Sequence, residues 1–105
     1  MNGRYVLDAD GNPKPEPDLM AWAKWFETGD RIVARTKVGE AEVSTVFLGL
    51  DHSPGASVPL LYETLIFGGP HDGESERYAT KEQAQKGHAE WVFRVDWMWS
   101  PKGGA

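Results

Sequence analysis

The sequence predicts an α+β fold, an antiparallel three- to four-stranded meander with two helices packed on one face. Two apolar arms, Val43–Leu50 and Leu60–Phe67, flank a loop of turn-forming residues, as in a hairpin. The segment before them, Asp30–Val38, alternates as a strand does. The flanking segments Asp18–Glu27 and Thr80–Val95 carry apolar residues at helical spacing. Hairpin, strand and helices together give the predicted architecture.

Length and composition indicate a single folded domain. The chain has 105 residues, of which 40% are hydrophobic and 26% charged, the balance of a globular protein. Residues 1–17 read as an N-terminal strand and a proline-rich connector, 18–95 as the core, and 96–105 as an aromatic and then Gly-rich tail. With no cysteine and no apolar run near ~18 residues, we expect a cytoplasmic protein without a membrane partner.

The net charge of −5 argues against direct binding to nucleic acid, where neutralised phosphates dominate affinity. It is compatible with a basic protein partner. Because the charges are interspersed along the chain, the simpler interpretation is a solvated surface.

Both expected helices have recognisable ends. Asp18 is the expected N-cap of the first helix, and Gly29 is expected to end it in the left-handed backbone conformation. In the second, Thr80 and Gln83 fit a capping box, and Gly87 lies on the apolar side, where it would let the helix approach the sheet closely. The following residues, 96–101, are too aromatic for a free terminus, so they either fold back over the sheet or form a contact surface.

The central arms are apolar on both faces, which predicts a cover on the second face as well. Residues 4–7, the Trp-rich tail or another subunit could supply it, and a homodimer is one solution. Within the second arm, Glu63 is expected to pair across strands with Arg31, Arg35 or Lys37. These three basic residues also form a cationic stripe, either a protected sheet edge or a site for phosphates.

Two Asp–His pairs are the sharpest catalytic hypothesis. Asp51-His52 follows the first central arm and His71-Asp72 the second, so in an antiparallel hairpin the pairs lie at opposite ends, and one shared metal site is not expected. No motif for a nucleophile, a phosphate loop or a zinc site occurs. The expectation is therefore a protein without catalytic residues, cofactor or metal.

The stretches that begin STVFLGLDH at Ser44, LYET at Leu61 and RYATKEQAQKGH at Arg77 carry a resemblance. With Trp22-Ala23 and Trp25-Phe26-Glu27 before them, they resemble a set of small bacteriophage and prophage proteins over roughly residues 19–92. Lys81 stands where an aromatic is usual in that set, and the tail from Trp97 onward has no counterpart there. The resemblance implies a phage context, in which the expected location is the cytoplasm of the host cell, and it transfers no catalytic residues.

That context suggests a small accessory protein that acts by binding. The first hypothesis is a modulator or inhibitor of a host or defence protein, with an anti-CRISPR-like role as one version. Its contacts would be the Asp51-His52 loop and the aromatic tail residues Trp97 and Trp99. An oligomeric sponge for a nucleotide signal would use the cationic stripe. A metal-dependent hydrolase would use the Asp51-His52 loop.

Overall fold

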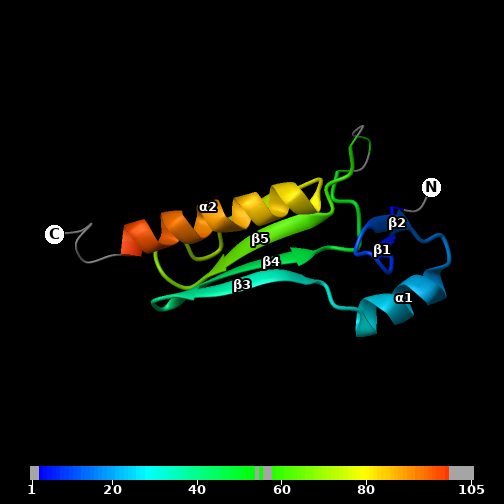
Figure 1. Cartoon of the computed structure of the whole chain (residues 1–105), viewed down its shortest axis with the longest axis horizontal. Helices are drawn as coiled ribbons and strands as arrows, with labels where there is room; N and C mark the ends of the chain where they lie inside the picture. The colour runs from blue at the N-terminus through cyan, green and yellow to red at the C-terminus, as the bar shows by residue number, and fades with distance from the viewer. Residues whose placement is uncertain (1–2, 54, 56–57, 100–105) are drawn as a thin grey trace.

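The fold class and the four-stranded meander are confirmed. The structure is a computed structural model that describes residues 3–53, 55 and 58–99. The elements are β1 (Tyr5–Leu7), β2 (Pro13–Pro15), α1 (Leu19–Thr28), β3 (Ile32–Val38), β4 (Ala41–Phe47), β5 (Tyr62–Phe67), β6 (Ser75–Tyr78) and α2 (Lys81–Trp99). Strands β3, β4, β5 and β6 form one antiparallel sheet in chain order, and β1 pairs with β2 in a second (Figure 1). None of the described helices is long and apolar enough to cross a membrane.

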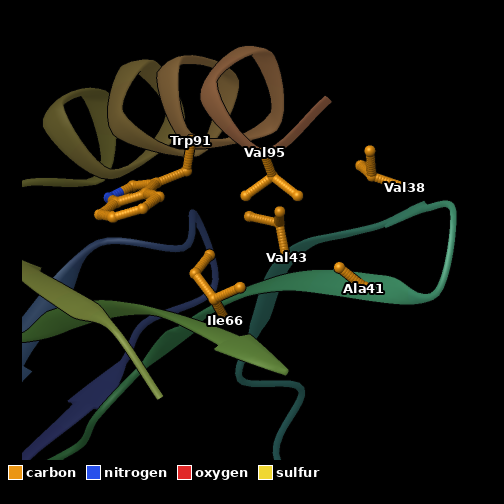
Figure 2. Close-up of a cluster of buried hydrophobic side chains, with 6 residues drawn as sticks. All are labelled: Val38, Ala41, Val43, Ile66, Trp91 and Val95. Atoms are coloured by element: carbon orange, nitrogen blue, oxygen red, sulfur yellow. The ribbon is translucent and has the colours of Figure 1, made fainter. Parts of the chain in front are cut away.

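Helix α2 lies along one face of the four-stranded sheet and encloses the core with it (Figure 1). In Figure 2, Trp91 and Val95 point from the helix toward Val43 and Ile66 on the central strands. A second cluster continues the core toward the start of α2 and contains Phe47, Leu61, Tyr62, Tyr78 and Ala84. Alternate residues of β4 are buried, so the strand gives one face to this core.

Helix α1 does not lie beside α2 on the sheet face. Asp18 caps it as predicted, accepting from the amides of Met20 and Ala21, but Gly29 ends it in extended backbone with φ −75° instead of the left-handed conformation expected. The helix contacts β1 beyond the end of the sheet (Figure 1). Its Trp25 ring meets Phe47 edge-on, with centroids 5.7 Å apart.

Gly49 explains how α1 is held there. Its carbonyl accepts from the Trp22 indole at 3.0 Å, and a Cβ on it would lie 3.0 Å from the Phe26 ring. Gly49 also has φ +78°, which favours glycine. The same carbonyl accepts from the Tyr5 amide at 2.9 Å, so α1 and β1 are both tied to the end of β4.

The proline-rich connector forms more structure than expected, because residues 13–15 pair with β1 as an edge strand, where proline is tolerated. This small sheet and α1 extend the molecule at one end (Figure 1). The extents are 54 × 28 × 22 Å, and the radius of gyration is 15.5 Å. A compact chain of this length has a radius of gyration of about 13 Å, so the protein is elongated.

The sheet face opposite α2 carries a row of apolar side chains: Ile32, Val46, Leu65 and Phe67. No described helix or strand packs across that face. Ile32 and Phe67 are about half exposed, at 51% and 49%. The predicted cover of this face is therefore not supplied by residues 4–7, which pair with β2 and with Leu50, shortly after β4.

Candidate functional site

The carboxylate of Asp51 holds its own loop together. It accepts from the backbone amide and the hydroxyl of Ser53, both at 2.8 Å, and from the Leu60 amide at 3.2 Å. These hydrogen bonds, led by the Ser53 amide, lower the pKa of Asp51. The neighbouring His52 is exposed, so it is the more accessible side chain of the two.

The second Asp–His pair has similar local roles at the far end of the hairpin. Asp72 accepts from the Gly68 amide at 2.6 Å, and His71 Nδ1 lies 2.6 Å from a Glu74 carboxylate oxygen. Because β4 and β5 are antiparallel, the loops after them lie at opposite ends, as the sequence predicts. Within residues 3–53, 55 and 58–99, no group of three His, Asp or Glu side chains is placed to hold a metal ion.

The predicted cationic stripe is divided. A bulge in β3 between Ile32 and Ala34 reverses the alternation of the strand, so Arg31 no longer shares a face with Arg35 and Lys37. The Arg31 guanidinium lies 4.0 Å above the Phe26 ring and donates to the Phe47 carbonyl at 3.3 Å. It lies on the side of the sheet that faces α2, away from the other two.

Arg35 and Lys37 lie on the open face of the sheet, on its edge strand. Arg35 forms an ion pair with Glu42 at 2.8 Å, and this hydrogen bond lowers the pKa of Glu42. Lys37 is exposed and opposite Glu42 in the strand register. Glu63 pairs with Arg77 on β6 at 3.1 Å, not with β3 as predicted, because β4 separates β5 from β3. Both ion pairs are typical of a solvated sheet face.

Residues 96–99 of the aromatic tail do not fold back over the sheet, because α2 continues through Trp99, and residues 100–101 lie outside the described part of the chain. Trp97 is 56% exposed, and the side chain of Trp99 lies outside the described part of the chain. Phe93, one turn before Trp97, is 71% exposed. Together they give α2 an apolar outer side that the sheet does not use.

We define the α2 outer face by the residues that line a shallow groove of about 760 Å³ along it: Lys86, Ala89, Glu90, Phe93, Arg94 and Trp97. Their spacing of three and four residues places them on one side of the helix. Arg94 is held in position by Trp91, with its guanidinium 4.2 Å from the ring. Exposed aromatic rings flanked by charged side chains are typical of protein-binding surfaces.

Sequence reasoning identified Trp97 and missed Phe93. The residues that the sequence places at helical spacing on the buried side are Ala84, His88, Trp91, Val92 and Val95, and Phe93 lies off that stripe. The signal that could have found it is an aromatic at the polar side of an amphipathic helix, in line with Trp97 one turn later.

Inside the protein, a chain of hydrogen bonds connects α2 to all four strands of the sheet. Tyr78 donates to Thr64 at 3.1 Å, Thr64 and Thr45 oxygens are 2.5 Å apart, and Thr45 lies 2.7 Å from His88 Nδ1. His88 Nε2 lies 2.9 Å from Thr36. A neutral His88 that accepts at Nδ1 and donates from Nε2 satisfies every group. The His88 network is thus a structural element, not a ligand set.

This network makes stability depend on pH. Burial lowers the pKa of His88 below its ordinary value of 6.5. The unfolded chain therefore takes up a proton at a higher pH than the folded protein does, and stability falls as pH drops below 6.5. The buried Tyr78 stays protonated over this pH range, because the ordinary pKa of tyrosine is 10.0 and burial raises it further. We expect urea midpoints to decrease from pH 7.5 to 5.5, and to decrease less in His88→Gln.

An equal decrease in the wild type and in His88→Gln would contradict the assignment, since it would place the titrating group elsewhere.

Comparison with protein-family models, with curated proteins and with solved structures finds no match to this chain.

Proposed function

We propose that the protein acts by binding another protein, as a small phage accessory protein that modulates or inhibits a host or defence protein. The observation that carries the proposal is the α2 outer face, with Phe93 71% and Trp97 56% exposed. Exposed aromatic rings that gather on one helix side are uncommon on a protein that works alone. An anti-CRISPR-like or other anti-defence role is one concrete version, which the resemblance to phage proteins supports.

The proposed mode of binding is a helix laid into a groove of the partner. The apolar residues Ala89, Phe93 and Trp97 would enter the groove, and Lys86 and Arg94 would contact its rim. Aromatic and arginine side chains provide most of the energy in such interfaces. The net charge of −5 favours association with a basic protein through long-range attraction.

The contact role proposed for the Asp51-His52 loop is secondary. The Asp51 carboxylate already closes the loop, and exposed His52 is what a partner would meet. For a nucleotide sponge, the division of the cationic stripe removes Arg31 from the phosphate-binding set, and Arg35 is already paired with Glu42. The α2 outer face therefore supports protein binding better than the stripe supports nucleotide binding.

The experiment that tests the proposal is affinity capture from a bacterial host lysate with the double variant Phe93→Ser/Trp97→Ser. We expect the wild type to enrich a defined protein and the double variant to lose it, with the dissociation constant of the purified pair rising at least about 100-fold. The matched control is Leu19→Ser/Met20→Ser, which removes two exposed apolar side chains of α1, 55% and 75% exposed. The control should retain the partner.

Because all four substituted residues are exposed, both variants should unfold within about 0.5 kcal/mol of the wild type. Equal capture by the wild type and the Phe93/Trp97 variant would contradict the proposal. Capture of a second copy alone would favour the homodimer instead, with the open sheet face as its interface. Sedimentation velocity of the Phe67→Lys variant then tests that interface, because Phe67 lies on this face and is 49% exposed, and a charge there should dissociate the dimer.

A further inference from the structure

The side chains of the α2 outer face follow one another in a definite order along the helix. Ala89, Phe93 and Trp97 are four residues apart, so they form a row with the smallest side chain at one end and the largest at the other. At about 1.5 Å per residue the row is roughly 12 Å long, with Phe93 at its middle. Glu90 and Arg94 form a second row beside it, with opposite charges. A helix that fits this face must carry matching features in the reverse order.

A second copy of α2, running antiparallel to the first, carries them in that order. A two-fold axis perpendicular to the helix and close to Phe93 makes residues at equal distances on either side of it face each other. Ala89 then lies opposite the second copy's Trp97, and the two Phe93 rings meet at the centre. Small residues opposite large ones allow two such faces to interdigitate. Because the arrangement is symmetric, the Ala89–Trp97 contact forms twice.

The charges favour the same arrangement. With that axis, Glu90 and the second copy's Arg94 lie on the same flank, offset by about 3 Å along the helices, which the arginine side chain can span. Glu90 has no ion pair within the described part of the chain, and both residues are exposed. Arg94 stacks on Trp91 at 4.2 Å and keeps N–H donors for a carboxylate. A parallel pair would place each residue level with its own copy, and the two ion pairs would be lost.

The size of the contact limits its strength. A large aromatic side chain buries about 150–250 Å² when fully covered, and Phe93 and Trp97 are 71% and 56% exposed. The four rings of a pair would therefore bury on the order of 500 Å². Stable specific interfaces bury about 1,200–2,000 Å² in total, so even with the flanking residues this contact is small. We expect a weak dimer, with a dissociation constant on the order of 10 μM.

We propose that the α2 outer face binds a second copy of this chain as an antiparallel pair, and that the dimer covers Phe93 and Trp97 until a different protein displaces it. The covering role rests on the proposed function, whereas the pair itself does not. A weak dimer dissociates on dilution. The face is therefore free at low concentrations of the chain and covered at high ones.

Sedimentation velocity of the purified chain from about 1 to 500 μM tests the pair. We expect the sedimentation coefficient to rise from the monomer to the dimer value around the expected dissociation constant. Glu90→Arg and Arg94→Glu should each raise that constant at least about tenfold, because each sets like charges against each other twice. An equimolar mixture of the two variants should recover the dimer, since every facing pair then has opposite charges.

The matched control is Phe67→Lys on the open sheet face, which should self-associate as the wild type does. Phe93→Ser/Trp97→Ser should remain a monomer. The proposal is overturned if the wild type is a monomer at every concentration, if the mixture of charge variants fails to recover the dimer, or if Phe67→Lys dissociates it. The last result would place the interface on the open sheet face.

Failure of this inference can be told apart from failure of the proposed function. A partner captured from the host lysate by a chain that never self-associates overturns the pair alone. Self-association through Glu90 and Arg94 without any captured partner confirms the pair and contradicts the proposed function together with the covering role. A captured partner that binds the intact dimer, with no dissociation seen by sedimentation, contradicts the covering role.

Discussion

Replacing Trp91 with alanine should lower the free energy of unfolding by about 3–5 kcal/mol. Trp91 is 4% exposed and packs against the core of the sheet with Val43, Ile66 and Val95 (Figure 2). Its indole also donates to a Glu76 carboxylate oxygen at 2.9 Å, which the substitution would leave without that donor. Urea denaturation at pH 7.5 measures the effect. An unchanged slope of unfolding free energy against urea concentration would show that the variant unfolds in the same transition as the wild type.

Phe93→Ala is the matched control, because it removes an aromatic ring from the same helix two residues later. Phe93 is 71% exposed, so its loss should change the free energy of unfolding by less than about 0.5 kcal/mol. Similar values for the two variants would mean that the faces of α2 are wrongly assigned, and the argument for the α2 outer face would fail with them.

Gly87→Ala should destabilise the protein by about 1–3 kcal/mol, because it overpacks the contact between α2 and β6. A Cβ at residue 87 would lie 2.3 Å from the Tyr78 hydroxyl oxygen and 2.4 Å from its ring carbon Cζ. Tyr78 cannot move aside easily, since it is 7% exposed and donates to Thr64. Helix propensity alone predicts the opposite sign, a gain of roughly 1 kcal/mol.

The opposite sign makes this prediction easy to check by urea denaturation. Ala89→Gly measures propensity alone at an exposed position of the same helix, and should lower stability by about 1 kcal/mol. If Gly87→Ala raised stability by a similar amount, α2 would have to lie farther from Tyr78 than the structure places it.

The parts of the fold that could be predicted are those with local signals. The central hairpin, the Asp18 cap, the Thr80 capping box and the close approach at Gly87 follow from turn residues, hydrogen-bonding side chains and periodicity. The position of α1 could not be predicted in this way. Its aromatic stripe shows which side is buried, but the contact with β1 and Gly49 depends on tertiary packing.

For the candidate site, the sequence indicated which residue types could bind or react, but not which residues lie next to them in the folded protein. Strict alternation along the strand predicts that Arg31 shares a sheet face with Arg35 and Lys37. One bulged residue in β3 places Arg31 on the other face. Asp51 stands beside His52 in the sequence, as a catalytic carboxylate could. In the structure its carboxylate accepts from Ser53 and Leu60, which only the folded loop brings next to it. Such contacts form only after the chain has folded.

Native mass spectrometry of the protein recovered gently from a bacterial host lysate tests most directly whether the protein acts by binding another protein, because it weighs each complex intact. We expect a complex with a second, different protein at fixed stoichiometry. That complex should disappear with Phe93→Ser/Trp97→Ser and persist with Leu19→Ser/Met20→Ser. A chain without a protein partner, or a partner that remains bound when both exposed aromatic rings of α2 are removed, would show that the α2 outer face is not a protein-binding surface.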